Sequence, residues 1–163
     1  MKENGFTLVE LLIVIIVIAI LLAMATLNFS AWSRKHNEEA QVKMMYTDML
    51  SAKVDAMHKR TQRIMNVNVI TNSYDIEDGA GTVVQPFRTL KFPVTTSAGA
   101  GINLGITFDV NGMNITANAP QTICLQTSDA SLAYDAIIID QVKVNLAKIN
   151  PGGNCAFANC TIK

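Results

Sequence analysis

The sequence predicts an α+β protein in which one long N-terminal helix packs on an antiparallel β-sheet or a β-sandwich-like domain. Three observations predict this fold class. An apolar run of helical length lies near the N-terminus, apolar residues then recur at three- and four-residue steps, and short runs rich in β-branched residues fill the remainder. The 163 residues leave room for one apolar segment and one domain of ordinary size.

The first element is an apolar segment over residues 6–27, which contains a single charged residue, Glu10. A helix needs ~20 apolar residues to cross a hydrocarbon core of roughly 30 Å, so the segment is long enough to be a transmembrane helix. The apolar region of a cleaved signal peptide is shorter, about 7 to 15 residues. The A-x-A triplet that begins at Ala23 leaves ordinary signal cleavage as the alternative.

Glu10 is the unusual residue of this segment. A carboxylate near the middle of an isolated span costs about 2.5 to 3.5 kcal/mol, and such residues usually have a partner. The apolar run offers no cationic side chain. A main-chain amine freed by a cut between Gly5 and Phe6 would lie one helical turn away or on a neighbouring copy. An amine from an adjacent subunit would make Glu10 an assembly register.

The stretch "GFTLVELL", which begins at Gly5, resembles the processing motif of type IV pilins and of the pseudopilins of type II secretion. The resemblance implies that residues 1–5 are a leader peptide and that a prepilin peptidase cuts between Gly5 and Phe6. It implies that Phe6 becomes the N-methylated first residue. It also implies that Glu10 pairs with the amine of a neighbouring subunit during assembly.

The same resemblance implies a location and a set of partners. The chain would be a single-pass protein of the bacterial inner membrane with its globular domain in the periplasm, and would later enter a pilus or pseudopilus filament. Its partners would be other pilin or pseudopilin subunits, the prepilin peptidase and the inner-membrane assembly platform.

The function that the resemblance implies is that of a structural subunit, a minor pilin or pseudopilin, of a type IV pilus-like filament. The alternatives are an H-type pseudopilin of a type II protein secretion system and a FimT-like minor pilin of DNA uptake. These alternatives rest on the order of "LKFPV", "ITFDVNG", "TICL", "DAIIID" and "VKVNL", which is similar to the globular part of those proteins.

The second element is an amphipathic continuation of the helix over residues 28–65. Its apolar residues recur with helical spacing, which predicts a stripe that packs on the following domain. The stripe consists of Val42, Met45, Tyr46, Met49, Ala52, Ala56, Met57 and Ile64. Trp32 lies just past the apolar segment, where an indole can rest in a membrane interface or take a simple packing role.

Residues 66–163 are predicted to form a β-rich globular domain of about six or seven antiparallel strands. The predicted strands are "VNVIT", "TLKFPV", "ITFDV", "MNITA", "TICLQ", "AIIID" and "VKVNL", and turn-forming residues separate them. Asn111-Gly112 predicts a two-residue hairpin turn. Pro93 predicts an edge strand or a bulge.

The chain has three cysteines. Disulfides persist outside the cytoplasm, and Cys155 and Cys160 bracket a short loop, so these two are the predicted pair. Cys124 would then be a buried, unpaired strand residue. Pairing of Cys124 with either of the others and an intermolecular bond are the alternatives.

The sequence predicts no enzyme, no cofactor and no metal site. It contains two histidines and lacks the H-E-x-x-H, G-x-S-x-G and C-x-x-C motifs. The stretch "YDIEDG" is predicted to be a solvated turn and not a calcium loop.

Nucleic-acid binding is not expected either. The chain carries 13 basic and 13 acidic residues, which leaves no electrostatic footprint for nucleic acid. The cluster of Lys59, Arg60 and Arg63 is predicted to be the solvated end of the helix, where cations suit the helix dipole.

Overall fold

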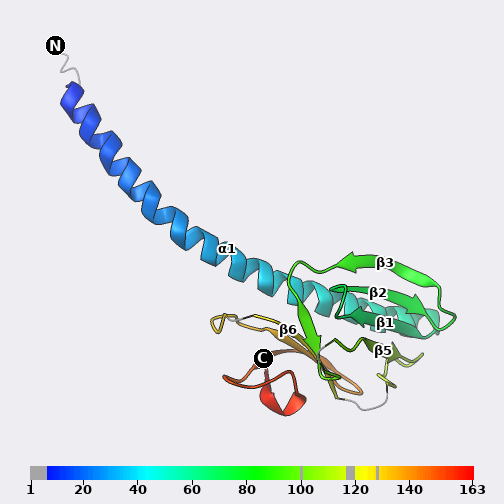
Figure 1. Cartoon of the computed structure of the whole chain (residues 1–163). Coiled ribbons are helices and arrows are strands. Elements are labelled where there is room, and N and C mark those ends of the chain that lie inside the picture. Colours follow the sequence, from blue (N-terminus) through cyan, green and yellow to red (C-terminus); the bar gives the residue numbers. More distant parts are fainter. Residues whose placement is uncertain (1–6, 100, 117–119, 128) are drawn as a thin grey trace. The chain divides into compact units, whose positions relative to one another are not determined.

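The computed structural model describes residues 7–99, 101–116, 120–127 and 129–163, with the backbone but not the side chains of residues 24–28. These residues form one long helix, nine strands and a short 3-10 helix, which confirms the α+β prediction (Figure 1). The elements are α1 (Leu8–Lys59), β1 (Arg63–Asn68), β2 (Ser73–Asp78), β3 (Val83–Thr89), β4 (Val94–Thr96), β5 (Leu104–Phe108), β6 (Gln121–Leu125), β7 (Ala136–Ile139), β8 (Val144–Ile149), η1 (Phe157–Asn159) and β9 (Cys160–Ile162).

The chain divides into two compact units. The N-terminal unit, Met1–His36, contains the first part of α1. The globular unit, Asn37–Lys163, contains the rest of α1 and the strands.

The strands of the globular unit form two antiparallel sheets. The first has four strands in the order β3-β2-β1-β5, and the second has five strands in the order β4-β6-β7-β8-β9. Pro93 directly precedes β4, which is an edge strand of the five-stranded sheet, as the proline predicts.

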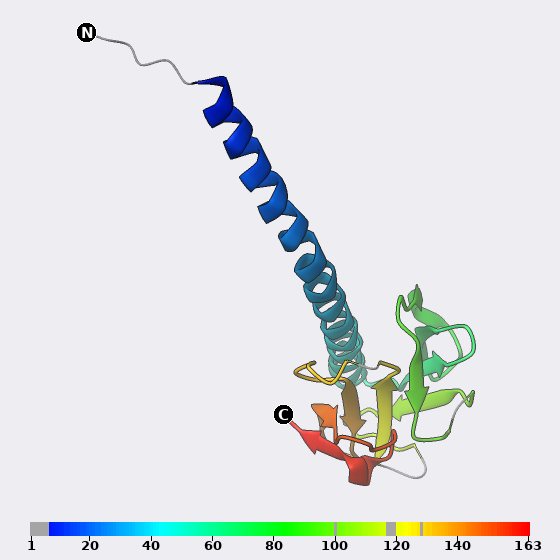
Figure 2. The ribbon, with the colours of Figure 1, turned by 60° about the vertical axis from the view of Figure 1, so that its left-hand side comes forward.

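One hydrophobic core joins the last part of α1 to both sheets, and the cyan part of the helix lies against them in both views (Figures 1 and 2). The predicted stripe supplies the helical side of this core with two exceptions: Met57 is 41% exposed, and Ile64 lies half-buried in β1 instead of in the helix. The buried helical residues are Val42, Met45, Met49, Ala52 and Ala56. The strands contribute Met65, Val67, Tyr74, Ile76, Ile106, Phe108, Ile123, Leu125, Ile137 and Ile139, among others.

The helix ends at Lys59, so the predicted end near residue 65 is wrong. Arg60 adopts a left-handed conformation with φ 52°, and the Thr61 N–H donates to the Ala56 carbonyl at 3.2 Å. This bond is the closing bond of a Schellman motif. The sequence gives no glycine signal at the turn, and the chain leaves the helix because Met65 packs fully buried in β1.

Strand β2 contradicts the prediction of a solvated turn at "YDIEDG". Tyr74 and Ile76 of this strand are buried, while Asp75, Glu77 and Asp78 are half-buried. The alternation that marks a half-buried strand was therefore present, but the three acidic residues obscured it.

The turn at Asn111-Gly112 forms, but it is longer than predicted. Asp109 and Met113 close it, with the Asp109 N–H donating to the Met113 carbonyl at 2.9 Å. Of the pair, only Gly112 has a positive φ, at 73°, so the turn is not the two-residue type that needs two positive angles. The Asp109 carboxylate stabilises the wider turn because it accepts the N–H groups of Asn111 and Met113 at 2.9 and 2.8 Å.

Candidate assembly site

The first turn of α1 places Glu10 next to a helix cap. Thr7 precedes the helix, and its Oγ1 accepts a hydrogen bond from the Glu10 N–H at 3.3 Å. The Thr7 carbonyl accepts the first helical bond, from the Leu11 N–H at 3.2 Å. Glu10 is therefore the third helical residue, where a carboxylate is favoured by the helix dipole, and T-x-x-E has the spacing of a capping box. The prediction from the sequence missed this local role.

The helix that follows Glu10 is apolar on every side. Leu11, Leu12, Ile13 and Val14 succeed one another around the helix and are 56, 52, 55 and 44% exposed. Residues 8–23 are all exposed in this chain. A helix that is hydrophobic all round is normally covered by a core, by other helices or by lipid, so this surface needs an apolar partner.

Among the helical residues whose side chains are described, no stretch combines the length and the apolarity that a membrane crossing requires.

Gly5 and Phe6, the predicted processing residues, lie outside the described residues. The cut between them and the methylation of Phe6 stay predictions. The pairing of Glu10 with an amine also stays a prediction.

The disulfide joins Cys124 to Cys155, so the predicted Cys155–Cys160 pair is wrong. Cys124 lies in β6, and the loop that carries Cys155 crosses this strand, where the Thr122 hydroxyl donates to the Cys155 carbonyl at 3.2 Å. Cys160 begins β9, which pairs with β8 and is the edge strand of the sheet farthest from β4 and β6. The pairing of the strands, and not closeness in sequence, therefore decides which cysteines meet. The disulfide fastens the C-terminal loop to β6.

Cys160 is the free cysteine, and its thiol is half-buried. Its Sγ donates to the Ala156 carbonyl at 3.4 Å. Burial raises the pKa of the Cys160 thiol, and the negative charge of Asp135 raises it further. The thiol is therefore held in its less reactive, protonated form.

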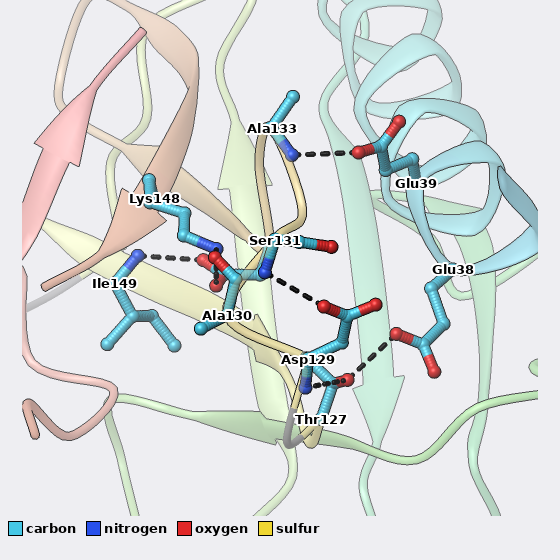
Figure 3. Close-up of polar contacts among 10 residues, drawn as sticks. Glu38, Glu39, Thr127, Asp129, Ala130, Ser131, Ala133, Lys148 and Ile149 are labelled. Carbon is cyan, nitrogen blue, oxygen red and sulfur yellow. Dashed lines mark hydrogen bonds and ion pairs between the residues drawn. The ribbon is translucent and has the colours of Figure 1, made fainter. Parts of the chain in front are cut away.

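Two adjacent glutamates of α1 hold the loop between β6 and β7 (Figure 3). Glu38, which is 1% exposed, accepts a hydrogen bond from the Thr127 hydroxyl at 2.8 Å. Glu39 accepts one from the Ala133 N–H at 2.7 Å. These contacts fasten the loop to the first helical turn of the globular unit. The partners are separated by 89 and 94 residues, so no local sequence pattern predicts these contacts.

A third carboxylate fastens the other end of the same loop. Asp135 is 6% exposed and accepts the Ile149 N–H at 2.7 Å. Its second oxygen lies 3.2 Å from the Lys148 ammonium, which also donates to the Ala130 carbonyl at 3.1 Å (Figure 3). The loop is thus anchored both to α1 and to β8.

Charges near the end of α1 are paired within the chain. The Asp55 carboxylate contacts Lys59 at 3.1 Å and Arg63 at 2.7 Å. Burial opposes ionisation of Asp55, but the hydrogen bonds from Arg63 and Lys59 outweigh it and hold the pKa of this carboxyl below its usual value. Two members of the predicted basic cluster are therefore partly neutralised.

The globular unit has polar cavities without a catalytic arrangement in its described part. A cavity of about 480 Å³ lies between β4 and the C-terminal loop, and it has no acidic, basic or imidazole side chain in its lining. A smaller cavity of about 230 Å³ is bordered by Asp55, Lys59 and Arg63, which pair with one another. No group of three or more His, Cys, Asp or Glu side chains gathers as a metal site among the described residues.

Comparison with known proteins gives one sequence match and one structural match. Residues 1–26 match the family model of the prokaryotic N-terminal methylation motif. The fold is similar to the crystal structure of the type IV minor pilin FimU of Pseudomonas aeruginosa strain PAO1, with a TM-score of 0.51 at 12% sequence identity. The similarity covers 71% of this chain and 91% of that chain. No curated protein matches the sequence.

The likeness to FimU shows a pilin-like arrangement of a long N-terminal helix followed by antiparallel sheets, as predicted. Residues 1–26 thus carry a prokaryotic N-terminal methylation motif, and the chain shares the fold of a solved minor pilin.

Proposed function

We propose that the chain is a structural subunit, and more narrowly a minor subunit, of a type IV pilus-like filament. One observation carries the proposal: the residues that match a methylation motif include the start of an α-helix that is exposed and apolar on every side and carries one carboxylate in its first turn. In a filament, the apolar helices of neighbouring subunits would cover this surface. Burial of apolar area at about 25 cal/mol per Å² would favour that packing.

The carboxylate of Glu10 gives the packing a register. After a cut between Gly5 and Phe6 by prepilin peptidase, the methylated amine of Phe6 would carry a positive charge at the start of the helix. In an apolar filament core, the Glu10 carboxylate of one subunit and the amine of its neighbour would each be costly alone and are stabilised as a pair. Subunits that are out of register would leave both charges unpaired.

The precursor would be anchored in the bacterial inner membrane by one pass of residues 6–27, with the globular unit in the periplasm. The Cys124–Cys155 disulfide supports this location, because such bonds persist outside the cytoplasm. The prepilin peptidase and an inner-membrane assembly platform would be its partners.

Variants of Glu10 test the assembly role against the capping role. Glutamine fits a capping box as well as glutamate does, so Glu10→Gln keeps the cap and removes the charge. We expect Glu10→Gln and Glu10→Ala to be made and membrane-associated normally but to be absent from sheared filaments. Thr7→Ala is the matched control, since it removes the cap and keeps the charge, and it should still assemble. Normal incorporation of Glu10→Gln into filaments would reject the hypothesis that the Glu10 charge sets the register of neighbouring subunits.

Mass spectrometry of the mature chain tests the processing step. We expect an N-terminal peptide that begins at Phe6 and carries one methyl group. An intact Met1 end in filaments would reject the proposal.

A pseudopilin of type II secretion is the second candidate, because the same N-terminal motif serves both classes in the resemblance described above. The pilus is preferred because FimU, a solved structure of similar fold, is a type IV minor pilin. Deletion of the gene separates the two: loss of surface pili supports the first, and loss of protein secretion with normal pili supports the second.

A further inference from the structure

Three ring side chains form a stripe near the end of the N-terminal unit. The rings of Phe29 and Trp32 have their centroids 6.0 Å apart. The His36 imidazole stacks on the indole at 5.7 Å with an interplanar angle of 7°. Phe29 and Trp32 are 65 and 62% exposed, and His36 is exposed as well. The three rings therefore present one continuous surface, here called the ring stripe.

The position of the ring stripe along α1 matches the thickness of a bilayer. The proposed span, residues 6–27, is ~33 Å long at about 1.5 Å per residue, and a hydrocarbon core is roughly 30 Å thick. Trp32 lies five residues beyond this span in the same helix, ~7.5 Å farther along its axis, in the headgroup layer. Two basic residues, Arg34 and Lys35, follow directly, at the depth where lipid phosphates lie.

We propose that the ring stripe is a binding surface for the headgroup layer of a phospholipid bilayer, on the periplasmic side of the membrane. This inference rests on the membrane-anchored precursor of the proposed function. Indole rings favour this layer because their faces are apolar while the N–H can bond to lipid carbonyls or water. The stacked His36 ring fixes the orientation of the indole on the side toward the aqueous phase.

The ring stripe sets the depth of the helix. Phe29 lies ~4.5 Å deeper than Trp32 along the helix, and His36 lies ~6 Å closer to the aqueous phase, at about 1.5 Å per residue. The globular unit begins at Asn37, directly after the last ring. The surface thus holds the first residue of the globular unit just outside the lipid until the subunit is extracted into the filament.

Trp32 is the only tryptophan of the chain, so its fluorescence reports on this surface alone. The full chain is reconstituted in phosphatidylcholine and phosphatidylglycerol vesicles whose acyl chains carry bromine either near the glycerol or near the methyl end. We expect blue-shifted indole emission that shallow bromines quench strongly and deep bromines quench weakly. Water-like emission without quenching, or equal quenching at both depths, overturns the inference. Blue-shifted emission that neither bromine position quenches would show the indole packed on another copy and also overturns it.

Two tryptophan-shifted variants serve as matched controls. Exchange of the two residues (Phe29→Trp with Trp32→Phe) should move the quenching toward the deep bromines, and His36→Trp with Trp32→Phe should remove most of it. An unchanged depth profile in both variants contradicts the assignment.

Flotation of the vesicles on a density gradient separates this inference from the proposed function. A chain that fails to float with vesicles overturns both the membrane anchor and the ring stripe. A chain that floats but shows water-like emission overturns the ring stripe alone.

Discussion

The guanidinium Nε of Arg63 lies 2.7 Å from Oδ2 of Asp55 and joins the last turns of α1 to the first residue of β1. Arg63 is 4% exposed, and its Nη1 also donates to the Thr61 hydroxyl and to the Gln62 carbonyl, at 2.8 and 3.0 Å. One buried side chain thus closes the corner at which the chain changes from helix to sheet.

Replacement of Arg63 should open this corner. We expect Arg63→Met to lower the free energy of unfolding by about 2 kcal/mol, because it removes a charge-assisted hydrogen bond and two further bonds. Urea unfolding of the detergent-solubilised chain, followed by circular dichroism, measures the loss. Lys59→Ala removes the other, 54% exposed partner of Asp55 and should cost less than ~0.5 kcal/mol. Equal losses in both variants would contradict the assigned role.

Acid should destabilise the globular unit through specific carboxylates. Hydrogen bonds from the N–H groups of Met113 and Asn111 lower the pKa of Asp109, and those of Thr82 and Ala80 lower the pKa of Asp78.

Between the lowered pKa and the usual 3.8, the unfolded chain binds more protons than the folded one. The contribution of each group is therefore fully present above that usual value and is lost as the pH falls through the lowered pKa. We expect the urea concentration at the unfolding midpoint to be constant near neutral pH. It should decrease once the pH is lowered below about 4. In the Asp109→Asn variant the urea midpoint should decrease less steeply with falling pH. An unchanged pH dependence in that variant would contradict the stabilising role of the Asp109 carboxylate in the turn.

The Cys124–Cys155 bond should stabilise the fold and resist exchange with Cys160. It closes a segment with a sequence separation of 31, for which the chain-entropy relation gives about 3 to 4 kcal/mol. Cys155→Ser should lower the unfolding temperature accordingly, and Cys160→Ser should leave it unchanged.

Peptide mapping of the unreduced chain checks the pairing directly. We expect one cross-linked pair of peptides, containing Cys124 and Cys155, and a Cys160 that alkylates only slowly because its pKa is raised. A cross-link between Cys155 and Cys160 would contradict the pairing.

The left-handed residue at the end of α1 offers a stabilising substitution. Arg60 has φ 52°, a conformation that costs a side chain roughly 1 kcal/mol and costs glycine nothing. Arg60→Gly should therefore raise the free energy of unfolding by about 1 kcal/mol, as measured by urea unfolding. Lys59→Gly, one residue earlier and inside the helix, should lower it by about 1 kcal/mol. If the free energy of unfolding changed in the same direction in both variants, the assignment of Arg60 as the left-handed cap residue would be rejected.

The sequence alone determined the features that depend on local patterns. The apolar run, the single carboxylate at Glu10 and the methylation motif lie within 26 residues, and their chemistry follows from residue type and spacing. The helical stripe from Val42 to Ala56 follows likewise from periodicity, since a face that must be buried shows itself at three- and four-residue steps.

Only the tertiary structure decided the end of the helix, the pairing of the cysteines and the partners of the buried glutamates. Arg60 turns without a glycine because Met65 packs in the core, and Cys155 meets Cys124 because the C-terminal loop crosses β6. Glu38 finds Thr127 across 89 residues of sequence. Such contacts depend on which strands pair and which surfaces pack. Because the contacting residues are far apart in the chain, no periodic pattern in the sequence predicts them.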